Sequence, residues 1–195
     1  MLACSPNTQP ANTGTDSTDV PADCKNCGAY HLCMSLWLKT GGSMLERVVK
    51  KKQVFKRGEV LYRMGQPLEY IYVIRGGSVK TCIGGEDGQV QVMGFHAAGE
   101  LLGLNAIGTR QHNCEARAMA TTSVCEVSVD RFEELAQKDP TVQYEIFKIM
   151  SAEIRHSQEL LLLLGKHNAE KRLAAFLLSL CNNLPSAIIP PLSSI

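Results

Sequence analysis

The sequence predicts an α+β fold in which a double-stranded β roll of jelly-roll type precedes a long helix. Between residues 53 and 129, short β-prone runs alternate with glycine turns, a pattern typical of a β sandwich or roll. After residue 130, apolar residues recur at steps of three and four, the spacing of an amphipathic helix. Hydrophobic residues make up 45% of the 195 residues, which is enough for a core of ordinary size.

The predicted strands are short and are separated by turns. They are expected at residues 53–56, 60–63, 70–75, 78–83, 90–96, 115–120 and 123–129. Residues 101–107 are expected to form one or two helical turns within the roll. Before the first strand, residues 43–52 are predicted to form a short helix, because Ser43 and Glu46 have the spacing of a capping box.

Two helices are predicted to follow the roll. Asp130 is expected to cap the first, at residues 130–138, and Asp139-Pro140 separates the two because proline disfavours helical geometry in the residue before it. The second helix is predicted at 141–164, with Gly165 as its C-terminal stop. A further helix is expected at 169–181, and the prolines after it exclude its continuation.

The helix at 141–164 carries a stripe of mostly apolar residues at alternating steps of three and four. The stripe consists of Phe147, Met150, Ile154, Ser157, Leu161 and Leu164. This spacing is typical of a coiled-coil seam, so we predict a dimer interface, with Ser157 as its polar position. The alternative is that the stripe packs on the β domain, since further apolar residues widen the surface beyond one seam.

The overall composition excludes some classes of protein. Lys and Arg number 20 against 19 Asp and Glu, so the chain shows no basic excess of the kind usual for a nucleic-acid-binding domain. No apolar run approaches the roughly twenty residues of a membrane span, and no secretory signal is present. We therefore expect a cytoplasmic protein without a membrane partner. Residues 1–23, rich in Ser, Thr, Pro, Asn and Asp, are expected to be disordered.

Eight cysteines in a cytoplasmic chain indicate metal or redox chemistry. Cys24, Cys27 and Cys33 have the spacing C-x2-C-x5-C, which lets neighbouring turns present three thiolates to one metal site. A cubane iron–sulfur cluster needs a fourth thiolate, and residue spacing leaves Cys114 and Cys125 both open. A structural zinc site is the alternative, and His31 could complete it. Cys4, Cys82 and Cys181 are expected to be inert thiols.

Catalysis is not expected. The five histidines are dispersed along the chain, without an H-x-H pair, and no nucleophile–base motif is present.

Several segments, in order, resemble the Crp/Fnr regulators of the Fnr (or Anr) branch. Besides C-x2-C-x5-C, they are YVIRGGSVK at 72–80, GFHAAGELLG at 94–103, NAIG at 105–108, VCE at 124–126 and NAEKRLAAF at 168–176. The resemblance runs from about Cys24 to Cys181. It implies a roll of the cyclic-nucleotide-binding type, a long dimerisation helix and then a winged helix-turn-helix domain.

The resemblance also implies an oxygen-sensing function. In the Fnr branch, three N-terminal cysteines and the cysteine of the Val-Cys-Glu strand hold a 4Fe–4S cluster, which corresponds to Cys24, Cys27, Cys33 and Cys125 here. Oxygen is expected to degrade the cluster, weaken dimerisation and abolish DNA binding. In the family, a turn such as that at 84–88 contacts RNA polymerase, although a solvated hairpin turn is an equally good interpretation.

Two features of other family members are not expected in this chain. Nucleotide-binding members carry an Arg-Ser pair near the place of Glu115 and Ala116, and a carboxylate there should repel a cyclic phosphate. We therefore predict no cyclic nucleotide and interpret Gly99-Glu100 as a structural turn. The resemblance also ends before the winged helix-turn-helix. DNA binding would then require the missing domain, and partners would be a second copy or a full-length homologue.

The expected domain organisation has five parts. It comprises a disordered tail (1–23), a cluster-binding segment (24–42), the β-roll sensor (43–129), dimerisation helices (130–181) and an irregular tail (182–195).

Overall fold

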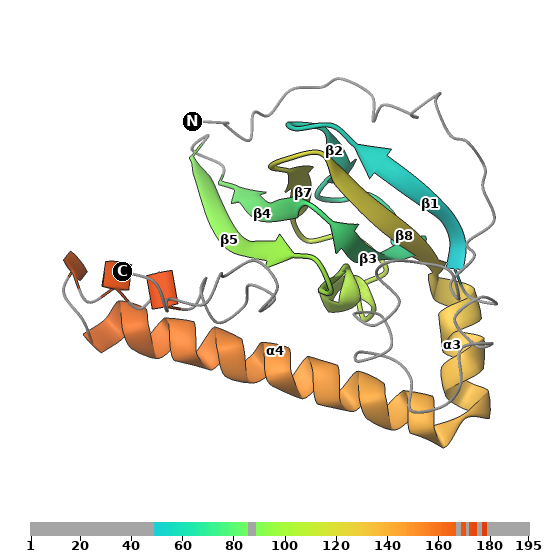
Figure 1. The fold of residues 1–195 in the computed structure, drawn as a ribbon. Helices are drawn as coiled ribbons and strands as arrows, with labels where there is room; N and C mark the ends of the chain where they lie inside the picture. The colour runs from blue at the N-terminus through green and yellow to red at the C-terminus, as the bar shows by residue number, and fades with distance from the viewer. Residues whose placement is uncertain (1–48, 86–88, 167–168, 171, 175–176, 179–195) are drawn as a thin grey trace, which may run out of the picture. The chain divides into compact units, whose positions relative to one another are not determined.

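The structure is a computed structural model that describes residues 49–85, 89–166, 169–170, 172–174 and 177–178 (Figure 1). It divides into two compact units, with the boundary between Gln143 and Tyr144. The first unit contains the β strands and the first long helix, and the second contains most of the next helix. The predicted segments 1–23, 24–42 and 182–195 lie outside the described residues.

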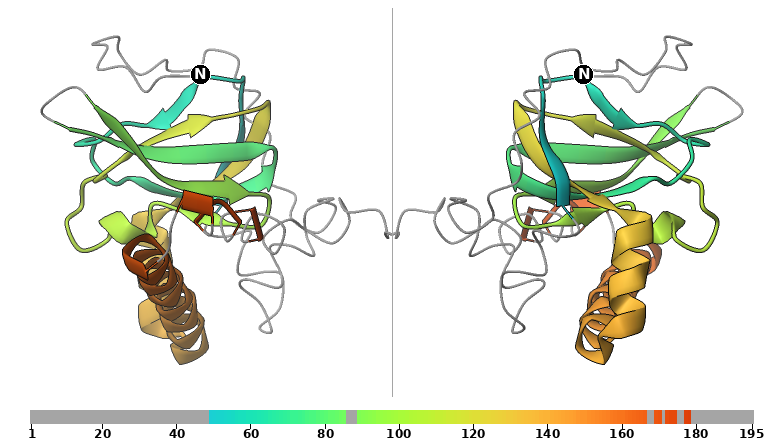
Figure 2. Two further views of the ribbon diagram at one scale, coloured as in Figure 1. Left: turned by 90° about the vertical axis from the view of Figure 1, so that its left-hand side faces the viewer. Right: turned by 90° about the vertical axis from the view of Figure 1, so that its right-hand side faces the viewer.

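Two four-stranded antiparallel sheets form the β roll within the described residues (Figures 1 and 2). In the first sheet the order is β1 (Val49–Phe55), β8 (Thr122–Ser128), β3 (Tyr70–Gly76) and β6 (Leu101–Leu102). In the second it is β2 (Val60–Tyr62), β7 (Glu115–Ala118), β4 (Ser78–Gly84) and β5 (Val90–Ala97). The predicted roll followed by helices is confirmed, and the seven strands predicted within it differ from the observed ones by a few residues at their ends.

The core of the roll lies between the inner faces of the two sheets. Tyr72, Ile74 and Val124 from the first sheet join Val79 and Ala116 from the second in one buried cluster. Because successive side chains of a strand point to opposite faces, the residues next to these in sequence lie on the outer faces. The alternation therefore tells us which side chains face the interior and which face away from it.

The turn Gly76-Gly77 carries the chain from the first sheet to the second. Gly77 has a φ of 89°, and a Cβ there would come within 2.5 Å of the Thr121 carbonyl oxygen. Thr122 fixes the same corner, since its hydroxyl donates to the Ser78 carbonyl at 3.0 Å and accepts from the Ser78 amide at 3.2 Å. Both the backbone angle and the space require glycine at position 77.

The helices begin close to the predicted positions, but with different caps. Helix α3 (Val129–Lys138) has Ser128 at its N-cap, and the predicted cap, Asp130, lies in the first turn. Helix α4 (Pro140–Lys166) follows at once. The Asp139 carboxylate accepts from the Thr141 amide at 2.8 Å, so Asp139 caps α4 and Pro140 occupies its first turn.

Two local predictions need correction, and a third is confirmed with an addition. The predicted helix at 43–52 is wrong from residue 49 onward, because these residues pair with β8 as part of strand β1. Gly165 does not end α4, which continues to Lys166. The segment 101–107 contains the predicted helical turn, η1 (Leu104–Ala106), and a short strand, β6, that was not predicted. The helical residues 169–170, 172–174 and 177–178 fall within the helix predicted at 169–181.

Among the described residues, no helix is long and apolar enough to cross a membrane.

Candidate metal centre

Cys125 lies in the middle of strand β8, and its side chain points away from the interior of the roll. Its neighbour Val124 belongs to the inner cluster, so Cys125 falls on the outer face of the sheet. Strands β1 and β3 flank it, placing Lys52 and Val73 directly opposite. The residue is buried, with 5% of its surface exposed.

Cys114, the other candidate for a fourth ligand, belongs to the interior of the roll. It is part of the buried inner cluster and forms hydrogen bonds with the side chains of Tyr62 and Asn105. Burial raises the pKa of the Cys114 thiol, although these two hydrogen bonds partly oppose the shift. Cys125 is buried to the same extent, so burial does not distinguish the two cysteines.

The two candidates differ in the face of the roll on which they lie. Cys125 faces outward, whereas Cys114 faces the interior. Cys82, Cys114 and Cys125 are not in disulfides, and Cys82 is buried in β4. Within the described ranges, no group of three or more His, Cys, Asp or Glu side chains is gathered for a metal. Cys4, Cys24, Cys27, His31, Cys33 and Cys181 lie outside these ranges.

The interior holds an aromatic pair that the sequence analysis missed. The rings of Tyr62 and His112 stack at 3.8 Å between centroids, with 11° between their planes. His112 is buried, its Nδ1 atom has no hydrogen-bond partner, and desolvation lowers its pKa to about 4. The imidazole is therefore neutral near pH 7. In the sequence, residues 112, 114, 116 and 118 alternate with polar residues at 111, 113, 115 and 117. This strand pattern could have placed His112 on the inner face of the sheet.

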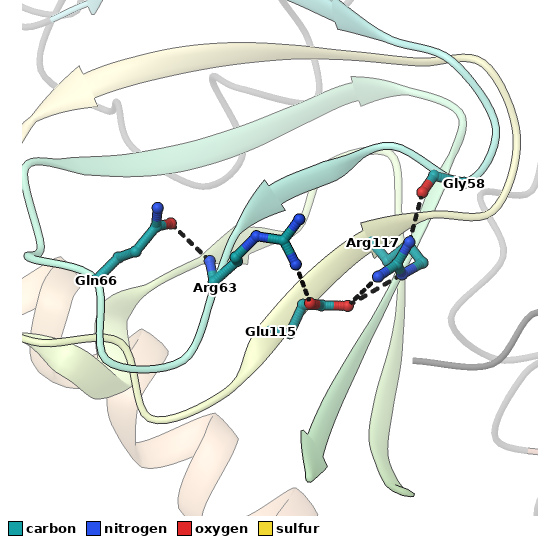
Figure 3. A network of polar contacts seen from close by, with 5 residues as sticks. All are labelled: Gly58, Arg63, Gln66, Glu115 and Arg117. Atoms are coloured by element: carbon teal, nitrogen blue, oxygen red, sulfur yellow. Dashed lines mark hydrogen bonds and ion pairs between the residues drawn. The ribbon is translucent and has the colours of Figure 1, made fainter. Parts of the chain in front are cut away.

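Glu115 lies on the outer face of β7, where it joins two arginines (Figure 3). Its carboxylate accepts from Arg63 Nη1 at 3.1 Å and from Arg117 Nη2 at 2.6 Å, and Arg117 also donates to the Gly58 carbonyl at 2.8 Å. Glu115 is therefore not placed to repel a cyclic phosphate, contrary to the prediction. Its charge is paired with two arginines, and its side chain faces away from the interior of the roll. The expected absence of a cyclic nucleotide stays a prediction.

Gly99-Glu100 forms a turn bonded to strand β3. The Gly99 amide donates to the Ile74 carbonyl at 2.8 Å, and the Ile74 amide donates to the Glu100 carbonyl at 3.0 Å. The Glu100 carboxylate lies 3.0 Å from His96 Nδ1, whose other ring nitrogen is 3.2 Å from the Thr81 hydroxyl. The backbone of this turn and the carboxylate of Glu100 thus both have hydrogen-bond partners within the roll.

The predicted dimer stripe lies on α4, and its described side chains are exposed within the single chain. Phe147 is 58% exposed, Ile154 57% and Leu161 68%, while Met150 and Ser157 are also exposed. The side chain of Leu164 lies outside the described part of the structure. Large apolar side chains are thus accessible along this stripe of α4.

Comparison with known proteins shows the family of the chain. The profile of the cyclic nucleotide-binding domain matches residues 52–139. The transcriptional activator protein Anr of Pseudomonas protegens is 39% identical over 160 residues, which cover 82% of this chain and 66% of Anr. The structure of FixK2 from Bradyrhizobium japonicum superposes with a TM-score of 0.65 at 31% identity, covering 70% of this chain and 68% of FixK2. The chain belongs to the Crp/Fnr family.

Other Crp/Fnr relatives are transcriptional regulators as well. The fumarate and nitrate reduction regulatory protein of Escherichia coli is 36% identical over 158 residues, which cover 80% of this chain and 63% of that protein. The chain thus spans somewhat less than two thirds of the length of these curated relatives. The prediction that it is not an enzyme is confirmed by this kinship with regulators.

Proposed function

We propose that this Crp/Fnr protein is an oxygen-responsive transcriptional regulator of Fnr type. Cys24, Cys27, Cys33 and Cys125 would hold a 4Fe–4S cluster that controls dimerisation through α4. The single observation that carries this proposal is the position of Cys125, a buried thiol on the outer face of β8. The relatives support it, since their names describe transcriptional activation and regulation of fumarate and nitrate reduction.

When bound, the cluster would supply a redox centre that oxygen can attack. The protein would contribute the anchoring. Cys125 would tie the N-terminal cysteines to β8, and β8 continues without a break into α3 and then α4. Such a link can shift the equilibrium between monomer and α4–α4 dimer when the free energy of dimerisation is only a few kcal/mol. The reason is that metal binding and chain ordering are coupled.

Dimerisation through α4 is supported by the exposed stripe. Its members alternate at steps of three and four, as the two seam positions of a heptad do. Exposed apolar side chains gain free energy when a second copy of the helix covers them. Ser157 replaces one of these apolar contacts with a hydroxyl and would keep the interface weak enough for the cluster to control.

The proposal includes no cyclic nucleotide. A cyclic phosphate is usually bound by a cationic side chain, whereas the buried inner cluster consists of apolar, phenol and thiol groups and the adjoining His112 is neutral near pH 7. Activity of the whole regulator would involve DNA through a winged helix-turn-helix, a second copy or a full-length homologue as partner, and RNA polymerase. We place this activity in the cytoplasm.

The decisive experiment is metal analysis of protein purified without oxygen, comparing wild type with Cys125→Ser and Cys114→Ser. Wild type should contain about four irons and four sulfides per chain, with a brown colour that bleaches in air. Cys125→Ser should lose most of this iron and sulfide, while Cys114→Ser should keep it. Loss of the cluster in Cys114→Ser with retention in Cys125→Ser would contradict the assignment of the fourth ligand.

A structural zinc site is the alternative function of the cysteines. It is favoured by the same C-x2-C spacing, because four thiolates also make a closed tetrahedral zinc site. Stoichiometric zinc in a colourless, air-indifferent protein would establish this alternative and reject the oxygen sensor.

A further inference from the structure

Lys52 is the ionisable residue directly opposite the proposed cluster ligand. The register pairs Lys52 of β1 with Cys125 of β8, and Val73 of β3 occupies the opposite side. Directly paired residues on one face of an antiparallel sheet have Cβ atoms about 5 Å apart. The Lys52 side chain therefore starts beside the Cys125 side chain on the outer face.

The surroundings of this pair are mostly apolar. Ile71, Val73 and Val127 share the outer face with Cys125 and are almost fully buried. Lys52 is half-buried. Charges in such surroundings interact more strongly than charges in water, because the local dielectric constant is lower.

We propose that the ammonium group of Lys52 sets the reduction potential and the oxygen stability of the cluster, an inference that rests on the proposed function. Four thiolates give a cluster with a net negative charge, and net charge is one of the factors that fix cluster potentials. A cation beside Cys125 would stabilise the reduced form of the cluster, which carries more negative charge. The bound cluster would supply the electron that oxygen accepts when it is reduced to superoxide, and the positive charge of Lys52 beside Cys125 would oppose the loss of that electron.

The test compares wild type with Lys52→Met, Lys52→Arg and Lys56→Met, all loaded with the cluster under anaerobic conditions. Lys56→Met is the matched control, because it removes the same charge just beyond the end of β1, four residues or about 13 Å of extended chain further along. That distance exceeds the Debye length of about 8 Å at physiological salt. The readouts are the midpoint potential in an anaerobic redox titration and the rate at which the visible absorption bleaches in air.

Lys52→Met should lower the midpoint potential and bleach about threefold to tenfold faster than wild type. Lys52→Arg and Lys56→Met should both stay close to wild type. If Lys52→Met does not fold, Lys52→Gln removes the same charge and takes its place. Unchanged potential and bleaching rate in the neutral variant, or an equal change in Lys56→Met, would overturn the inference.

Failure of the proposed function would appear separately. In that case the wild type itself would contain no sulfide, before any variant is compared.

Discussion

At the scale of single residues, the sequence predicts which groups can bind a metal but not which way they point. The C-x2-C-x5-C spacing indicates three ligands directly, whereas Cys114 and Cys125 are equivalent by spacing alone. Strand pairing separates them, because Val124 faces the interior and Cys125 therefore faces outward. Lys52 was missed for the same reason, since its role depends on its pairing across the strands with a residue more than seventy positions away.

His112 should make stability depend on pH. Its pKa falls from 6.5 to about 4 on folding, so the unfolded chain binds the proton more tightly. This contribution to stability is present above the unfolded pKa and is lost as the pH falls toward the folded one. Lowering the pH from about 7 to about 5 should therefore reduce the free energy of unfolding by about 2 kcal/mol.

His112→Phe keeps a ring against Tyr62 and removes the titration. Urea unfolding at the two pH values should therefore show a pH dependence smaller by about 2 kcal/mol in the variant than in wild type. Equal pH dependence in the two proteins would mean that His112 titrates normally in the folded state.

At the scale of elements, the β-prone runs and glycine turns identify the strands of the roll because their patterns are local. The helix predicted at 43–52 is wrong from Val49 onward, since pairing with β8 overrides the local capping pattern. Asp139-Pro140 marks a boundary as predicted, but the cap is Asp139 itself. Tertiary pairing and the exact cap depend on contacts that local sequence patterns do not contain.

Substitution by alanine should destabilise the protein far more at Gly77 than at Gly58, which has the same backbone angle. Gly77 and Gly58 both have a φ of 89°, but an added Cβ meets Thr121 and Thr122 only at Gly77 and has open space at Gly58. Gly58→Ala should cost about 1 kcal/mol for the left-handed conformation, and Gly77→Ala about 3 kcal/mol or more.

Urea unfolding of these two variants and of wild type measures the difference. Equal destabilisation by the two substitutions would show that the corner can shift to admit a side chain.

At the scale of the whole molecule, the family, the roll and the following helices could be predicted from the sequence. Assembly could be predicted only as a hypothesis, because a stripe such as that on α4 is equally suited to a core or to a partner helix. Phe147, Ile154 and Leu161 are exposed on α4, and dimerisation through them stays a prediction.

Ser157→Leu should make dimerisation independent of oxygen. The substitution adds a large apolar side chain at the polar seam position of each copy, so the dimer should tighten by about tenfold or more. Analytical ultracentrifugation with and without air should then find dimers in both conditions, whereas wild type should dissociate in air.

Ser151→Leu is the matched control, since it makes the same exchange at an exposed position of α4 outside the stripe. It should behave like wild type. Dissociation of Ser157→Leu in air to the same extent as wild type would show that the seam lies elsewhere.

Strand β8 is hydrogen-bonded on both sides, to β1 and to β3, for most of its length. A strand held in this way opens only when a large part of the sheet opens with it, so its local unfolding is costly. Cys125 thus lies on a strand whose local unfolding is costly. We therefore expect β8 to keep its position in the sheet whether or not the proposed cluster is bound.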